Sequence, residues 1–297
     1  MNALLTSKDL ILSFPSGREI HFDGLSLNKG EFLMVLGPNG SGKTSFLSLF
    51  SLPKPYLSYH GELILHFEGK DINLGSRLSP GDTAYYRTRV AYLEQDDSYL
   101  WSTSVYDVLV RGSIAKLEAM PKPDGIDANY WKNEKKARKK ALKKLVSSLW
   151  EELRMKGDEE HRGGLLGDIP VFLNHPRFLP YSSLSGGQKK MVRFYALYLQ
   201  AKVLGSSLLV LDEPLNDLDK ENKKTMSNLL GELLKEEEAP AIICVSHCHI
   251  FPYARSKRLE IGEDGHAKFV DLLSIDPSFH PCLGEPVDEK YAIGEGK

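Results

Sequence analysis

The sequence predicts an α/β fold built on a parallel sheet, and two observations carry this prediction. An apolar strand at residues 32–36 leads through a glycine-rich turn into a helical run at residues 45–50. Later, two apolar strands at residues 207–211 and 240–245 flank a helix at residues 220–237. Strand, helix and strand in that order imply a parallel βαβ unit.

Short strands and turns account for the rest of the first third of the chain. We expect strands at residues 9–14, 19–22, 31–36, 62–67 and 90–93, separated by segments that contain Gly, Pro and Asn. Pro15-Ser16-Gly17 and Asn28-Lys29-Gly30 are expected to be hairpin turns. A helical region begins at residues 104–117 and extends towards Pro180. A last hairpin, residues 258–261 with 267–270, precedes a tail with spaced prolines.

Composition excludes several classes of protein. The 297 residues are 41% hydrophobic and 26% charged, which is typical of a folded globular chain. The net charge of −2 gives the whole molecule no electrostatic reason to bind nucleic acid. No secretory signal is expected, and the apolar stretches are far shorter than the ~20 residues that span a bilayer. Three cysteines are too few for a disulfide scaffold, which favours a reducing compartment.

A basic helix is predicted at residues 130–156. Its apolar residues recur at helical spacing, and the segment carries ten basic against three acidic side chains. Two interpretations stay open: a surface that docks on a membrane or a partner, and a solvated face of an amphipathic helix. The glycine-, proline- and charge-rich residues 156–180 are expected to form a loop.

The glycine-rich turn matches the pattern G-x-x-x-x-G-K-[ST], between a strand and a helix as the motif requires. Glycines let backbone N–H groups turn inward around a polyphosphate, while a lysine reaches its outer phosphates and a hydroxyl suits Mg²⁺. The motif therefore predicts nucleotide binding. The phosphate loop is Gly37, Pro38, Asn39, Gly40, Ser41, Gly42, Lys43 and Thr44, followed by Ser45.

Two carboxylates, Asp212 and Glu213, directly follow the apolar strand at residues 207–211. Ligands of open parallel sheets bind at the carboxyl ends of the strands. Asp212 therefore suits Mg²⁺, and Glu213 suits proton acceptance from an attacking water. A plain helix-capping pair is the alternative interpretation.

A second anion site is suggested where Leu184-Ser185-Gly186-Gly187-Gln188 opens a helix at residues 189–200. A flexible loop is the alternative for this segment alone. Two phosphate cradles on one chain make sense if two copies meet head to tail, each closing over the nucleotide of the other.

Taken together, these motifs resemble the ATP-binding-cassette (ABC) ATPases, over roughly residues 14–247. The order of the phosphate loop, Gln95, the Leu-Ser-Gly-Gly-Gln signature, the carboxylate pair, Leu218-Asp219 and His247 matches that family. The resemblance implies a P-loop NTPase fold with a RecA-like parallel core, an antiparallel β subdomain and an inserted α-helical subdomain.

The resemblance also implies a role for individual residues. Phe14 would stack on adenine, with a core position as the alternative, and Gln95 would link Mg²⁺ or the lytic water to the helical region. His247 would contact the γ-phosphate. The signature residues Ser185, Gly186, Gly187 and Gln188 would contact the nucleotide of the opposite copy, with Ser185 and Gly187 holding it. Asp219 would lie at the dimer contact.

The chain departs from the family pattern in three places. Residues 215–219 read Leu-Asn-Asp-Leu-Asp instead of having small hydroxyl residues before Leu-Asp. The helix after the signature lacks the usual second run of arginines, and the interval from Gln95 to Leu184 is longer than is typical. None of these departures removes a catalytic group.

The resemblance leads to an expected organisation. Residues 1–98 with 185–262 would form the nucleotide-binding core, residues 99–184 the helical subdomain with the basic insertion, and residues 263–297 the hairpin end and tail. Cys244, His247, Cys248 and His249 lie close together in the sequence and suggest a zinc site. The site is disfavoured because His247 has another role and Cys244 lies in a predicted strand.

The expected function is an ATPase subunit that dimerises on Mg-ATP, with ATP and Mg²⁺ as cofactors. It would work with integral membrane subunits, at the cytoplasmic face of the membrane, as a homodimer or with a similar ATPase, and without nucleic acid. The alternatives are a soluble ABC ATPase of DNA repair, translation or cofactor assembly, and a small-molecule kinase. A single cassette without a zinc hook disfavours the first, and the signature disfavours the second.

Overall fold

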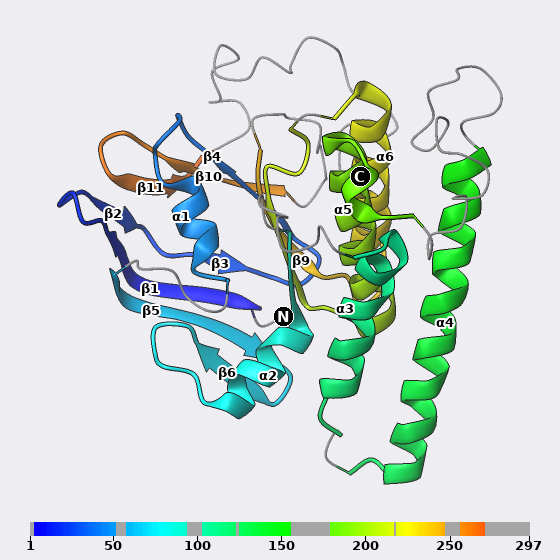
Figure 1. Cartoon of the computed structure of the whole chain (residues 1–297). Helices are drawn as coiled ribbons and strands as arrows, with labels where there is room; N and C mark the ends of the chain where they lie inside the picture. Colours follow the sequence, from blue (N-terminus) through cyan, green and yellow to red (C-terminus); the bar gives the residue numbers. More distant parts are fainter. Residues whose placement is uncertain are drawn as a thin grey trace, which may run out of the picture. The chain divides into compact units, whose positions relative to one another are not determined.

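The computed structural model describes residues 3–51, 58–93, 103–122, 125–155, 179–216, 218–246 and 256–270 (Figure 1). The chain divides into two compact units. The sheet unit comprises Met1–Gln95 and Ser206–Lys297, and the helical unit comprises Asp96–Gly205. Gln95, Asp217, His247, Cys248, His249 and the tail beyond residue 270 lie outside the described residues.

Five parallel strands form the core of the sheet unit. Their order is β10 (Ser256–Ile261), β4 (Phe32–Leu36), β9 (Ala241–Val245), β8 (Leu208–Asp212) and β7 (Val90–Leu93). Every residue of β4, β8 and β9 is buried, as expected of parallel strands covered on both faces. The helix α6 (Lys220–Leu234) connects β8 to β9, so the predicted βαβ unit is confirmed.

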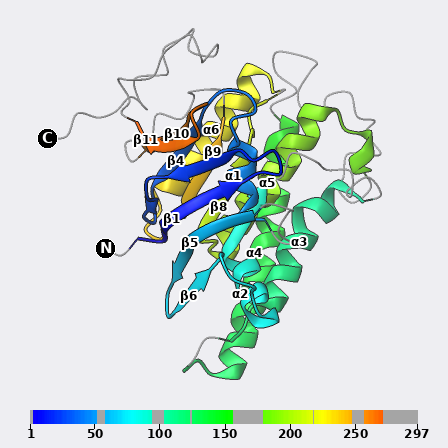
Figure 2. The same cartoon turned by 90° about the vertical axis from the view of Figure 1, so that its left-hand side faces the viewer.

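Antiparallel strands extend the same sheet. They are β6 (Lys70–Asn73), β5 (Ser58–Phe67), β1 (Leu5–Ser13) and β2 (Glu19–Phe22), with the two-residue strand β3 (Ser26–Leu27) also paired to β1. Figure 2 shows β1, β5 and β6 side by side. The last hairpin completes the sheet, because β11 (His266–Phe269) pairs antiparallel with β10 and parallel with β2. Residue 263, where we expected the C-terminal segment to begin, therefore lies inside a hairpin that belongs to the sheet.

Two local expectations need correction. The turn at Asn28-Lys29-Gly30 is present, since Glu31 N–H donates to Asn28 O over 3.2 Å, but the hairpin prediction is wrong. The strands on either side, β3 and β4, pair with other strands and not with each other. The helix α2 (Pro80–Arg89) was not expected, although Ser79 caps it by accepting from Asp82 N–H and Pro80 opens it.

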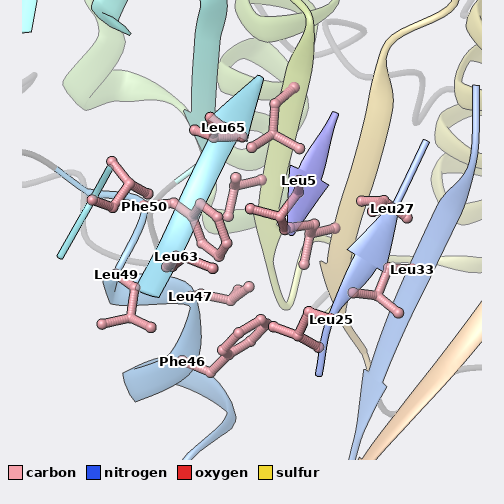
Figure 3. Close-up of a cluster of buried hydrophobic side chains, with 14 of the residues drawn as sticks. Leu5, Leu25, Leu27, Leu33, Phe46, Leu47, Leu49, Phe50, Leu63 and Leu65 are labelled. Atoms are coloured by element: carbon pink, nitrogen blue, oxygen red, sulfur yellow. The ribbon is translucent and has the colours of Figure 1, made fainter. Parts of the chain in front are cut away.

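A short helix, α1 (Lys43–Ser48), anchors the hydrophobic core of the sheet unit (Figure 3). Phe46 and Leu47 are fully buried between side chains of both parts of the sheet. Leu5, Leu63 and Leu65 come from the antiparallel strands, and Leu33 comes from β4. The residues just after the phosphate loop are therefore held by the core, which fixes the loop at the end of β4.

Three helices make up the described part of the helical unit: α3 (Val105–Ala119), α4 (Ala128–Met155) and α5 (Gly186–Leu204). A 3₁₀ turn at Tyr181–Ser183 precedes α5. The helix α4 packs against both α3 and α5. This packing explains why α5 belongs to the helical unit. From the sequence, we expected the nucleotide-binding core to resume at residue 185, whereas the sheet unit resumes at Ser206.

Candidate functional site: a phosphate loop with two carboxylates

The phosphate loop has the backbone conformation that its glycines allow. Gly37, Gly40 and Gly42 have φ angles of 145°, 76° and 108°, which favour glycine. A β-carbon at Gly37 would lie 2.5 Å from the Ile261 carbonyl oxygen, and one at Gly42 would lie 2.4 Å from Ile20 Cδ1. The φ angle therefore favours glycine at both positions, and at Gly37 the Ile261 carbonyl leaves no room for a β-carbon.

Lys43 lies buried inside this loop. Its Nζ donates to the carbonyl oxygens of Gly37 and Pro38, each over 2.8 Å. Burial lowers the pKa of Lys43, while the nearby charges of Glu213 and Asp212 act in the opposite direction. A buried ammonium that is incompletely solvated favours an incoming anion, which is what a polyphosphate provides.

Two further hydroxyls of the loop fit a nucleotide with its metal. Ser41 Oγ is buried and has no hydrogen-bond partner among the described residues. Thr44 Oγ1 lies 3.4 Å from Asp212 Oδ1, and Asp212, at the end of β8, is only 5% exposed. A hydroxyl beside a carboxylate is an all-oxygen donor set, which suits Mg²⁺ that keeps waters and phosphate oxygens as its other ligands.

Glu213 sits in an unusual backbone conformation. Its φ is 47°, in the left-handed region that non-glycine residues adopt rarely and mostly at special sites. Its N–H donates to Val245 O over 3.0 Å, and the Asn216 side-chain amide donates to Glu213 Oε2. The backbone of Glu213 is thus held by Val245 and its half-buried carboxylate by Asn216, and the contact with Asn216 was not foreseen from the sequence.

The turn between β1 and β2 also reaches the phosphate loop. Arg18 Nη1 donates to Gly40 O over 2.7 Å, and Nη2 donates to Ser41 O over 3.2 Å. Phe14, half-buried against the core, begins this turn, and its Cζ lies 3.4 Å from the position of a β-carbon on Gly42. Phe14 is therefore beside the loop, and its contact with adenine stays a prediction.

Arg18 is a positioning residue that sequence reasoning missed, and its loss should weaken nucleotide binding. Arg18→Gln removes two hydrogen bonds from a cation to loop carbonyls, worth about 1 kcal/mol together at this partly exposed site, or about fivefold in the Kd for ATP. Isothermal titration calorimetry measures this change. Arg87→Gln, which alters an exposed arginine of α2, should leave the Kd unchanged. Equal Kd values for the Arg18 and Arg87 variants would contradict this role.

The signature residues open α5 in the helical unit. Ser185 is the N-cap and forms a capping box with Gln188: Gln188 N–H donates to Ser185 Oγ, and Ser185 N–H donates to Gln188 Oε1. Gly186 is exposed and a side chain there would meet open space. The capping box thus presents a well-formed helix N-terminus at an accessible surface.

Asp219 has a local role in the sheet unit. It is the N-cap of α6, where Oδ1 accepts from Asn222 N–H over 2.8 Å and Oδ2 accepts from the Asn222 side-chain amide over 2.7 Å. A dimer contact at Asp219 stays a prediction. So do the roles of Gln95 and His247, which lie outside the described residues.

The zinc interpretation gains no support from the described part of the chain. Cys244 is fully buried in β9, and burial raises the pKa of its thiol well above the usual value. A neutral buried thiol is a poor zinc ligand, because the thiolate is the ligating form. The described residues hold no group of three or more potential metal ligands of the His, Cys, Asp and Glu types.

Comparison with known proteins identifies the family. A family model described as ABC transporter matches residues 22–216, which contain the phosphate loop, the signature and the carboxylate pair. The chain belongs to the ABC transporter family. Among known structures, the cassette resembles an ATP-binding cassette solved as a dimer in a post-hydrolysis state with ADP and Pi, with a TM-score of 0.56 and 18% identity over 90% of this chain and 98% of that one. The expected ABC ATPase fold is therefore confirmed.

Two relatives show how the cassette is used elsewhere. It is 27% identical to the ABC transporter ATP-binding protein ModF of Escherichia coli, over 80% of this chain and 40% of ModF. It is also 27% identical to the phosphate import ATP-binding protein PstB of Pyrobaculum aerophilum, over 82% of this chain and 81% of PstB. The chain thus spans less than half of ModF but most of PstB. Among the helices that the structure describes, none has the length and apolar character to cross a bilayer.

Proposed function

We propose that this ABC cassette binds and hydrolyses Mg-ATP and thereby drives transport through separate membrane subunits. The observation that carries the proposal is the cluster of Lys43, Asp212 and Glu213 at the end of the parallel strands in a chain of this family. ATP hydrolysis needs positioning and charge stabilisation more than covalent chemistry, and these three side chains supply both. Of the two relatives, PstB has phosphate in its name and ModF has no cargo in its name, so the proposed activity includes no cargo.

Each residue of the cluster has one task in this reaction. Lys43 contacts the outer phosphates after exchanging its present carbonyl partners, Gly37 and Pro38, for phosphate oxygens. Thr44 and Asp212 would hold Mg²⁺, which would supply charge neutralisation on the phosphates. Glu213, oriented by Asn216, accepts the proton of the attacking water.

The signature supports a dimer in which each copy completes the nucleotide site of the other. Ser185 and Gly187 would place the N-terminus of α5 against the γ-phosphate of the opposite copy, where backbone N–H groups and the helix dipole favour negative charge. Closure on ATP and opening after hydrolysis would then be two states whose populations the nucleotide shifts. Gln95, His247, Phe14 and Asp219 have the supporting roles that the family resemblance implies.

Co-purification tests the transport part of this proposal. The tagged full chain, carrying Glu213→Gln to slow turnover, is captured from detergent-solubilised membranes of the source cells in the presence of Mg-ATP. We expect an integral protein with several membrane spans to be enriched, and the wild-type chain to show ATPase activity that EDTA abolishes. Enrichment of soluble repair, translation or assembly factors alone would contradict a transporter subunit.

A further inference from the structure

The basic side chains of α4 fall into two sets that differ in their contacts. The inner set is used within the helical unit: Lys135 donates to Glu118 O and Met120 O, Arg138 pairs with Glu134 over 2.8 Å, and Lys139 pairs with Glu118. The outer set is exposed and forms no ion pair with any carboxylate in the described part of the chain. Its members are Lys132, Lys136, Lys140, Lys143 and Lys144.

The outer lysines share one side of the helix. At 100° per residue they occupy an arc of about 120°, and from Lys132 to Lys144 they extend about 18 Å along the axis. Outside this arc, α4 carries Leu142 and Val146, both almost fully buried against the neighbouring helices. Figure 1 shows α4 beside α3 in this arrangement. Packing therefore holds the helix in place, and this packing does not involve the lysine face in the part of the chain that the structure describes.

Apolar and small side chains border this arc. At 100° per residue, Tyr130 (62% exposed) and the exposed Ala137 and Ala141 follow the edge of the arc at Lys144, whereas Leu145 (36% exposed) lies about 100° beyond that edge. From residue 128 to residue 148 the only acidic side chain is Glu134, which is half-buried and paired with Arg138. The outward surface of this stretch thus combines a row of cations with an aromatic and aliphatic margin and carries no exposed carboxylate.

We infer that the outer lysine face of α4 binds the headgroup region of an anionic lipid bilayer. Five lysines in a row present diffuse positive charge, which suits a plane of phosphate groups, whereas specific carboxylate pairs with a protein favour the arginine fork. The tyrosine and aliphatic margin suits the boundary between headgroups and acyl chains. Because the chain has a net charge of −2, such an attraction has to come from a local cluster and not from the overall charge.

The inference goes beyond the proposed ATPase activity, because none of the outer lysines belongs to the nucleotide site. It deepens the proposed membrane association by naming a surface that contacts lipid directly. Each lysine near an anionic bilayer contributes about fivefold to the partition coefficient at low salt, so loss of three should reduce binding by about a hundredfold. Binding should weaken with salt, since the Debye length is about 8 Å at physiological ionic strength.

Vesicle sedimentation with the full-length chain tests the inference. Phosphatidylcholine vesicles with and without phosphatidylserine are compared for the wild type, for Lys136→Gln, Lys140→Gln and Lys143→Gln combined, and for a matched control with Lys8→Gln, Lys235→Gln and Lys268→Gln combined. The control removes the same charge from scattered exposed positions. We expect binding of the wild type and the control to phosphatidylserine vesicles only, and loss of binding in the α4 variant.

Two readouts keep the outcome interpretable. ATPase activity without vesicles should be equal in all three proteins, so a failure of lipid binding is distinct from a failure of the proposed ATPase function. Wild-type protein that ignores phosphatidylserine vesicles but binds polyglutamate or RNA would overturn the inference. Equal vesicle binding by the α4 variant and its control would overturn it as well.

Discussion

Glu213→Gln should slow ATP hydrolysis by about a thousandfold while leaving the Kd for ATP within about twofold of the wild-type value. The glutamine keeps the size of the side chain and can still contact Asn216, but it cannot accept a proton from water. The hydrolysis step is therefore lost, whereas the phosphate loop that binds the nucleotide is untouched. Single-turnover hydrolysis and equilibrium binding, measured on the same preparation, separate the two effects.

The control for Glu213→Gln is Glu62→Gln, which neutralises an exposed carboxylate on β5. This variant should hydrolyse ATP at the wild-type rate. A Glu213→Gln protein that turns over ATP at the parental rate would show that another group accepts the proton. An increase in the Kd as large as the loss in rate would instead indicate that Glu213 acts in binding.

Lys43→Met should raise the Kd for ATP by about a hundredfold, with a matching loss of hydrolysis. The substitution keeps an unbranched side chain of nearly the same length but removes the only ammonium of the phosphate loop. Burial lowers the pKa of Lys43, which means that the buried ammonium costs stability. Its removal should therefore change the free energy of unfolding much less than the free energy of ATP binding. Calorimetric titration with ATP and chemical denaturation measure the two quantities.

Lys8→Met, at an exposed position of β1, is the matched control and should bind ATP normally. If Lys43→Met bound ATP as tightly as Lys8→Met, the phosphate loop would not be the nucleotide site. If Lys43→Met failed to fold, Lys43→Arg would replace it, because that variant keeps the charge but changes its shape.

The parallel core was predictable from the sequence for a physical reason. The strands β4, β8 and β9 are buried on both faces, and burial of that kind requires the unbroken apolar runs seen in the sequence. The phosphate loop was equally visible, because its glycines are required by φ angles and close contacts at fixed positions. Local residue types determine both features.

Features that depend on distant contacts were not predictable in the same way. The helix α2 buries only Tyr86 and Thr88, so it has too weak an apolar period to be detected, although its cap residues are present. Arg18 reaches loop carbonyls 22 and 23 residues further along the chain, and no periodic pattern marks such a contact. The turn at Asn28-Lys29-Gly30 has hairpin composition, but the pairing of β4 with β9 and β10 overrides the local preference.

Each nucleotide site is proposed to need a second copy of the chain, and light scattering of the Glu213→Gln protein with and without Mg-ATP tests this most directly. We expect monomer without nucleotide and dimer with it. Adding Ser185→Arg should keep the protein monomeric in the presence of Mg-ATP. The control, Ser104→Arg, removes the N-cap of α3 in the same way and should still allow the dimer to form. Two results together would contradict the proposed mechanism. The Glu213→Gln protein would stay strictly monomeric when saturated with ATP, and the wild-type chain would hydrolyse ATP at full rate as a monomer.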